Sequence, residues 1–83
     1  MAEINYEKFL SELIKPIVIY PNEVIVKTFS EDNDTITLQV MVNEADLGRV
    51  IGKKGRVANA IRTIAFACGA KNGKRLEVSI DSF

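Results

Sequence analysis

The spacing of hydrophobic residues near the start of the chain predicts an amphipathic helix beginning at about residue 5. Tyr6, Phe9, Leu10, Leu13 and Ile14 recur at intervals of three and four. This spacing places them on one face of a helix, with charged residues between them. Pro16 lacks a backbone N–H, so the helix should end or kink there, with a kinked continuation to about residue 19.

Three later segments have the composition or the alternation of strands. Residues 24–29 are mainly β-branched and aromatic, which favours a strand, and the polar residues 31–34 suit a hairpin turn. Residues 35–42 and 75–81 alternate apolar and polar side chains. They therefore indicate strands with one buried face, most clearly in residues 35–42.

Two helices are predicted between the last two strands. The first covers residues 44–51, with Asn43 as its N-cap and Asp46 completing a capping-box-like pair. The second covers about residues 56–68, and Gly69 suits its C-cap. The predicted inner stripe of this second helix consists of Val57, Ile61, Ile64 and Cys68.

The element order is therefore αββααβ. A crossover of two helices is long enough to make the second and third strands parallel neighbours, whereas the first two strands form an antiparallel hairpin. Because the strands have one apolar face, all helices should cover that face. We predict an α+β fold, a three-stranded mixed sheet covered on one face by three helices, and the 83 residues suffice for one domain.

The bend between the two central helices contains two glycines that bracket Lys53 and Lys54. Glycine is unfavourable inside a helix, so we expect Gly52 to take a positive φ after the first helix. Gly55 should allow backbone or ligand to approach closely where the second helix begins. Free amides, a positive helix-dipole end and two ammonium groups at one place predict an anion-binding site.

The distribution of charge supports a basic surface on a chain whose formal net charge is zero. Residues 1–46 contain three lysines and nine carboxylates, whereas residues 47–83 contain eight basic and two acidic residues. Such asymmetry indicates one basic surface, although a solvated lysine-rich face is the alternative explanation. The basic residues flank the glycine bend, which favours the anion-binding interpretation.

Other classes of chemistry find little support. The chain has no histidine and one cysteine, which excludes imidazole acid–base chemistry, His-bearing metal sites and an internal disulfide. Cys68 is expected to be a small core residue in a reducing cytosol. We find neither a membrane-length apolar stretch nor a signal segment. We therefore expect a cytoplasmic protein that is not an enzyme, without metal, cofactor, membrane or small-molecule substrate.

The segment from residue 35 to residue 81 resembles the KH motif of RNA-binding proteins. A Gly-x-x-Gly sequence between two helices of a βααβ unit is a specific signature, and here Val50-Ile51 precedes it. The αβ extension over residues 5–30 resembles the type II arrangement. The resemblance covers all 83 residues, and the run from Leu47 to Gly52 is similar to the small bacterial single-KH proteins of the KhpA family.

This resemblance implies a cytoplasmic protein that holds about four nucleotides of single-stranded RNA. It implies a homodimer or a complex with the larger KH protein KhpB (Jag/EloR), and roles as an RNA chaperone or post-transcriptional regulator linked to cell shape and envelope growth. The loop residues Gly52, Lys53, Lys54 and Gly55 would contact the RNA backbone. The remaining candidate RNA-binding residues are Arg49, Val50, Ile51, Arg56, Val57, Ala58, Ile61, Lys71, Lys74 and Arg75, of which the five apolar ones would wall a groove for the bases.

Alternatives remain open for parts of this interpretation. The apolar candidates of the groove wall could be plain core, and Lys71, Lys74 and Arg75 could form only a solvated loop. A helix-turn-helix DNA binder rarely places its helices between paired strands, and the spacing does not fit a phosphate-binding loop of nucleotidases. A protein-interaction module with little RNA binding is the main rival function.

Phe66 lies opposite Val57 on a helical wheel, so it should be either exposed or covered by a partner. We therefore expect a candidate dimer interface on the late part of the second central helix. Its residues are Thr63, Ile64, Phe66 and Ala67.

Overall fold

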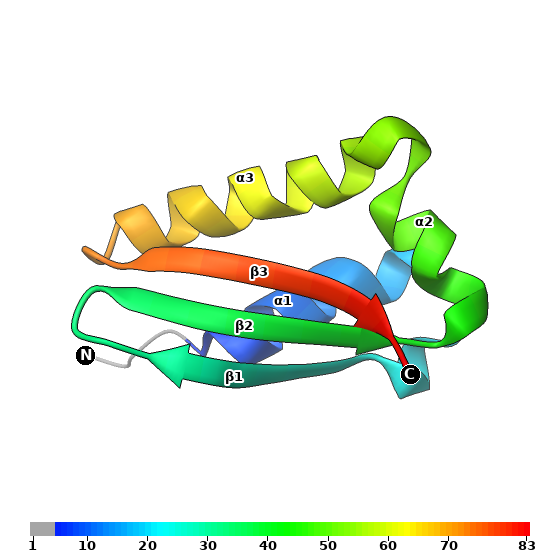
Figure 1. The fold of residues 1–83 in the computed structure, drawn as a ribbon, viewed down its shortest axis with the longest axis horizontal. Coiled ribbons are helices and arrows are strands. Elements are labelled where there is room, and N and C mark those ends of the chain that lie inside the picture. The colour runs from blue at the N-terminus through cyan, green and yellow to red at the C-terminus, as the bar shows by residue number, and fades with distance from the viewer. Residues whose placement is uncertain (1–4) are drawn as a thin grey trace.

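A computed structural model of the chain describes residues 5–83 and has the predicted order of elements (Figure 1). The strands are β1 (Ile25–Glu31), β2 (Thr35–Val42) and β3 (Arg75–Ser82), and the helices are α1 (Tyr6–Ile14), α2 (Leu47–Ile51) and α3 (Arg56–Ala70). Short 3₁₀ turns cover Lys15–Ile17, Pro21–Glu23, Glu44–Asp46 and Lys53–Gly55. None of the helices in residues 5–83 is both long and apolar enough to cross a bilayer.

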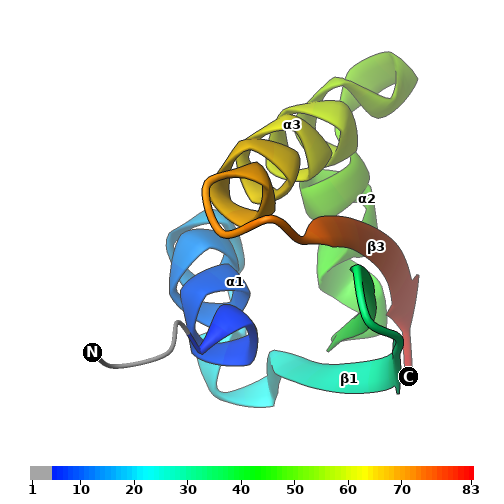
Figure 2. The same cartoon turned by 90° about the vertical axis from the view of Figure 1, so that its left-hand side faces the viewer.

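The sheet has the strand order β1-β2-β3, with β1 antiparallel to β2 and β2 parallel to β3. This confirms the predicted α+β fold with a mixed three-stranded sheet. The alternation in β2 buries Ile36, Leu38, Val40 and Val42 on one face. The helices lie on that face of the twisted sheet (Figure 2) and contribute Leu10, Ile14, Val50 and Ile61 to the core.

The first helix ends as its sequence predicts. The side-chain oxygen of Asn5 accepts a hydrogen bond from the Lys8 amide at 3.0 Å, and Pro16 stands in the 3₁₀ turn that follows α1.

Glu7 fixes α1 to β1, because its Oε2 accepts hydrogen bonds from the hydroxyl and the amide of Thr28, each at 2.7 Å. Both hydrogen bonds lower the pKa of Glu7, and the bond from the Thr28 hydroxyl has the larger effect.

The buried face of α3 differs from the predicted stripe. The residues of α3 that are buried are Ala58, Ile61, Ala65 and Gly69, whereas Ile64 is 43% exposed and Cys68 is half-buried. Small residues on this face allow the helix to pack close to β3. The prediction of Gly69 as a C-cap is wrong, because α3 continues to Ala70 and a Cβ at Gly69 would lie 2.8 Å from the Leu76 side chain.

Candidate nucleic-acid interface

The four-residue GKKG loop, Gly52–Gly55, connects α2 to α3 in an unusual backbone conformation. The φ angles of Gly52, Lys54 and Gly55 are +76°, +58° and +75°. Two hydrogen bonds tighten the turn: the Gly52 amide donates to the Gly48 carbonyl at 2.8 Å, and the Gly55 amide donates to the Gly52 carbonyl at 3.1 Å. The predicted positive φ of Gly52 is therefore confirmed, and the loop turns the chain from α2 into α3.

The two glycines have different roles from those expected. A Cβ at Gly52 would lie 2.4 Å from Cγ2 of Val57, so the close approach occurs at this position. A Cβ at Gly55 would meet nothing within 4 Å. No backbone therefore approaches Gly55 closely, and the approach of a ligand there stays a prediction. The φ of Gly55 favours glycine, whereas Gly52 is required by both its φ and its contact with Val57.

Lys54 has a left-handed backbone conformation, which costs a residue with a side chain about 1–2 kcal/mol. Among the non-glycine residues of 5–83, only Lys54 has a positive φ. Lys53, Lys54 and Arg56 are all exposed. The N-cap of α3 is Gly55, which has no side chain to cap the helix, so the positive end of the α3 dipole coincides with three exposed cations. This end of α3 is suited to an anion.

Most of the apolar candidates for a groove wall lie beneath the surface. The exposed fractions of Val50, Ala58 and Ile61 are 0%, 4% and 2%, so these side chains form the core that supports the loop, and their expected place in a groove wall is not found. Ile51 and Val57 are only partly buried. These two side chains are the part of the predicted wall that a ligand could contact.

A shallow groove lies between α3 and β3, with a helix-side lining that differs from the apolar wall expected from the KH resemblance. It is lined on the helix side by Asn59, Arg62, Thr63 and Phe66, and on the strand side by residues 75–78. Nε of Arg62 donates to the carbonyl of Val78 at 3.1 Å, across this groove. The sequence offers no local signal for it, because the groove depends on how α3 is placed against the free edge of β3.

The three basic candidates after α3 lie far from the GKKG loop (Figure 1). The helix has 15 residues and is thus about 22 Å long, with the loop at one end and residues 71–75 at the other. Nζ of Lys74 donates to the Asn33 carbonyl at 2.6 Å, and Nε of Arg75 lies 3.8 Å from a carboxylate oxygen of Glu77. The structure therefore does not bring Lys71, Lys74 and Arg75 to the loop.

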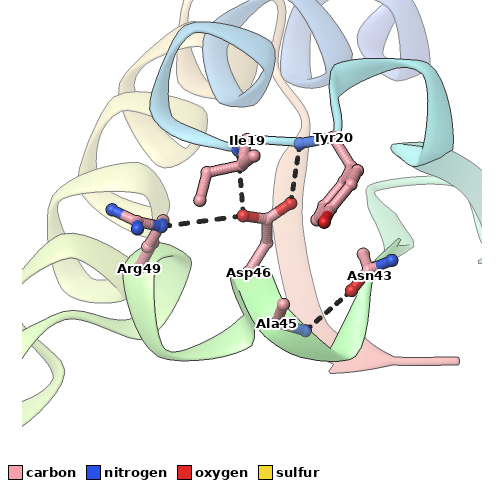
Figure 3. Close-up of polar contacts among 6 residues, drawn as sticks. All are labelled: Ile19, Tyr20, Asn43, Ala45, Asp46 and Arg49. Atoms are coloured by element: carbon pink, nitrogen blue, oxygen red, sulfur yellow. Dashed lines mark hydrogen bonds and ion pairs between the residues drawn. The ribbon is translucent and has the colours of Figure 1, made fainter.

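Asp46 and Arg49 form a polar cluster at the start of α2 (Figure 3). Asp46 is fully buried, and its two carboxylate oxygens accept hydrogen bonds from the amides of Ile19, at 2.9 Å, and Tyr20, at 3.0 Å. The predicted capping-box role of Asp46 is therefore wrong. Asn43 does act as an N-cap, since its side-chain oxygen accepts from the Ala45 amide at 2.8 Å.

Residues 5–83 contain no cluster of three or more side chains suited to hold a metal ion. Around the loop, the described surface offers cationic and hydrogen-bonding groups: the exposed Lys53, Lys54 and Arg56, the uncapped start of α3, and Arg49 one turn before the loop. Groups of this kind suit an anionic ligand.

Comparison with known proteins gives a consistent result. Residues 7–80 match the model of the family described as KhpA/KhpB, KH domain. The chain is 40% identical over 74 residues to the RNA-binding protein KhpA of Listeria monocytogenes, covering 89% of this chain and 96% of that protein. It is 35% identical over 81 residues to the RNA-binding protein KhpA of Bacillus subtilis, covering 96% and 98%.

The fold also occurs in a larger solved protein. A crystal structure of Era from Aquifex aeolicus, bound to GDP and aluminium fluoride, matches with a TM-score of 0.67. The match covers 99% of this chain and 33% of the Era chain at 18% sequence identity, and it therefore concerns the fold alone. The family match and the relatives show that the chain belongs to the KhpA/KhpB family of KH-domain proteins, and the Era match agrees with its type II KH fold.

Proposed function

We propose that this KH-domain protein binds single-stranded RNA by holding the sugar–phosphate backbone of about four nucleotides on its GKKG loop. One observation carries the proposal: three residues with positive φ turn the chain at the uncapped start of α3, where Lys53, Lys54 and Arg56 are exposed. The names of the Listeria and Bacillus relatives, both called RNA-binding proteins, support it.

The path of the bases follows from the surface next to the loop. Ile51 and Val57 offer partly buried apolar contacts beside the GKKG loop. Further along α3, the groove against β3 contains the Arg62 side chain. The plane of a guanidinium group can stack on an unpaired base. We therefore place the bases along the α3–β3 groove, with the backbone on the loop.

Only a few phosphates are within reach of this site, so a single domain should bind with modest affinity. Each phosphate contact to a single strand changes the slope of log K against log salt by about −0.7. Two copies on one RNA would raise the effective concentration and hence the overall affinity. We exclude Lys71 and Lys74 from the site, because they lie at the other end of α3 and outside the α3–β3 groove, whereas Arg75 lines that groove.

The direct test is a fluorescence anisotropy titration with a labelled single-stranded oligoribonucleotide. The variant Lys53→Asp/Lys54→Asp should lose about tenfold or more in affinity at 0.1 M salt, because the phosphate contacts are replaced by repulsion. Lys8→Glu/Lys15→Glu is the matched control: it changes the net charge equally at two exposed lysines of α1 and its following turn, and it should bind nearly as the wild type does.

Two other results would point elsewhere. Equal RNA affinity in the wild type and the Lys53→Asp/Lys54→Asp variant would favour a protein-interaction module. A preference for duplex DNA over single-stranded RNA would favour a helix-turn-helix type of binder.

We also propose that the exposed late face of α3 pairs with a second copy or with a KhpB-type protein. Ile64 and Phe66 are 43% and 56% exposed, and their neighbours Thr63 and Ala67 are exposed as well. Sedimentation of the variants Ile64→Asp and Phe66→Asp tests this surface. If both variants are folded and keep the oligomeric state of the wild type, the interface lies elsewhere.

The cellular part of the proposal comes from family membership alone. It comprises a role as an RNA chaperone or post-transcriptional regulator that influences cell shape and envelope growth. In the source organism, a Lys53→Asp/Lys54→Asp allele should change cell dimensions in the same direction as deletion of the gene. Normal cell dimensions in both strains would contradict this role.

A further inference from the structure

Among residues 5–83, Asp46 is the one charged residue that is buried. Its carboxylate holds the amides of Ile19 and Tyr20 at 2.9 and 3.0 Å, and Nε of Arg49 lies 3.7 Å from Oδ1 (Figure 3). A buried carboxylate is tolerated only where hydrogen bonds and an opposite charge compensate for its lost hydration. The amides supply the hydrogen bonds and Arg49 supplies the charge.

The geometry of this pair leaves most of the arginine available. Nε is the guanidinium nitrogen closest to the carboxylate, and the Arg49 side chain is 53% exposed. Among residues 5–83, Arg49 makes no side-chain hydrogen bond to the protein, and its contact with Asp46 is an ion pair at 3.7 Å. Because guanidinium is a rigid planar fork, the attraction of Nε to this carboxylate at ion-pair distance biases the direction in which the Nη atoms point.

Arg49 is also well placed along the chain. It precedes Gly52 by three residues and Lys53 by four, so it stands one helical turn before the GKKG loop. It is the basic residue that α2 contains. An RNA strand that leaves the loop on this side would meet the Nη atoms of Arg49 next.

We propose that Asp46 is a positioning residue that orients Arg49 to bind an RNA phosphate adjacent to the one held by the GKKG loop. The inference rests on the proposed function, since it extends the same binding site by one phosphate. The competing explanation is structural: Arg49 only neutralises Asp46, and Asp46 only ties the segment 18–20 to the start of α2.

The substitutions Arg49→Gln and Arg49→Lys separate these explanations while Asp46 itself stays in place, and Arg49→Lys also keeps the positive charge beside it. In salt titrations of single-stranded RNA binding, Arg49→Gln should lower the affinity about fivefold, and the slope should be less steep by about 0.7, the value of one phosphate contact. A lysine keeps the positive charge but has a single side-chain nitrogen. It therefore has no counterpart of the two Nη atoms that would bind the phosphate while Nε faces Asp46. Arg49→Lys should therefore lose most of the RNA affinity that Arg49→Gln loses, and its circular dichroism spectrum should be unchanged.

A double-mutant cycle tests the role of Asp46 itself. Asp46→Asn should weaken RNA binding in the wild type and cause no further loss in the Arg49→Gln background, because both changes remove the same contact. Affinities are corrected for the folded fraction of each variant. If Asp46→Asn does not fold, the comparison of Arg49→Lys with the wild type still decides whether orientation matters.

The outcomes are distinct. Wild-type affinity and slope for Arg49→Lys, or an unchanged slope for Arg49→Gln, would overturn the inference. Equal losses from Asp46→Asn in both backgrounds would also overturn it, since Asp46 would then act on α2 as a whole. If Lys53→Asp/Lys54→Asp also bound RNA like the wild type, the proposed function itself would fail, and not only this extension of it.

Discussion

Two loops of similar composition flank α3, and they differ in the end of the helix that they adjoin and in what their lysines contact. The GKKG loop precedes the helix, and the second loop, Lys71-Asn72-Gly73-Lys74, follows it. Each has four residues, including two lysines. In the second loop the amides of Asn72 and Lys74 donate to the Gly69 carbonyl, each at 2.9 Å, and Nζ of Lys74 donates to the Asn33 carbonyl.

The difference follows from the polarity of the helix between them. Amides and a partial positive charge are found at the start of a helix, whereas carbonyls and a partial negative charge are found at its end. Lysines at the start of α3 therefore add to an unfavourable concentration of positive charge that an anion relieves. Lysines at its end complement the dipole and stabilise the fold. The same residues thus form a candidate binding site at one end and a structural cap at the other.

The largest expected difference between the loops concerns their glycines. Gly52→Ala should lower the free energy of unfolding by about 3 kcal/mol, because a Cβ collides with Val57 in a region of φ and ψ reserved for glycine. Gly73 has a φ of +69° and open space around a Cβ, so Gly73→Ala should cost only about 1 kcal/mol. Urea denaturation measures both values, and equal losses would contradict the asymmetry.

The next difference concerns RNA binding. Lys53→Gln/Lys54→Gln should reduce the slope of log K against log salt by about 1.4 and the affinity about tenfold, since two phosphate contacts are lost. Lys71→Gln/Lys74→Gln removes the same charge and should leave both quantities within about twofold of the wild type. Salt titrations with a short oligoribonucleotide provide the comparison. A similar slope change in both variants would mean that RNA reaches both ends of α3.

A smaller effect is expected from the backbone of the GKKG loop. Lys54→Gly removes the left-handed strain, worth about 1–2 kcal/mol, but gives the unfolded chain about 0.4–1 kcal/mol of extra conformational freedom. The folded state should gain about 1 kcal/mol. Lys53 has no positive φ, so Lys53→Gly should instead lose about 0.5–1 kcal/mol. Thermal denaturation of this charge-matched pair tests the prediction, and a loss of stability in both variants would contradict it.

The smallest expected effect is electrostatic and differs in sign between the two loops. At low salt, Lys53→Gln/Lys54→Gln should raise the free energy of unfolding by about 0.3–1 kcal/mol, and Lys71→Gln/Lys74→Gln should lower it by a similar amount. Both changes should shrink at 0.5 M salt, because exposed charges are then screened. Denaturation curves without RNA at the two salt concentrations measure the effect. Changes of the same sign would show that the helix dipole does not distinguish the loops.

Much of the fold could be predicted from the sequence, because it depends on neighbouring residues. The alternation in residues 35–42 predicts a strand with one buried face, and Pro16 predicts the end of α1. The positive φ of Gly52 also follows from its position between two helical patterns. Each of these properties comes from the period of side chains along a backbone or from the φ preference of one residue.

The errors occur where contacts between distant segments decide. The helical period allowed Ile64 on the inner face of α3, but the structure buries Ala65 and leaves Ile64 43% exposed. Asp46 was assigned to a local cap, whereas it accepts hydrogen bonds from amides that are 26 and 27 positions away in the sequence. The helix-side lining of the α3–β3 groove was missed for the same reason.

The sequence by itself thus determined the order and type of the elements and the presence of a cationic glycine turn, because both depend on consecutive residues. Only the tertiary structure decided which lysines remain available. Lys74 is tied to Asn33, 41 positions away, whereas Lys53 and Lys54 extend into solvent at the positive end of α3. The physical reason is that the availability of a charged group depends on what the folded chain places beside it, and this packing is not encoded in the local pattern of side chains.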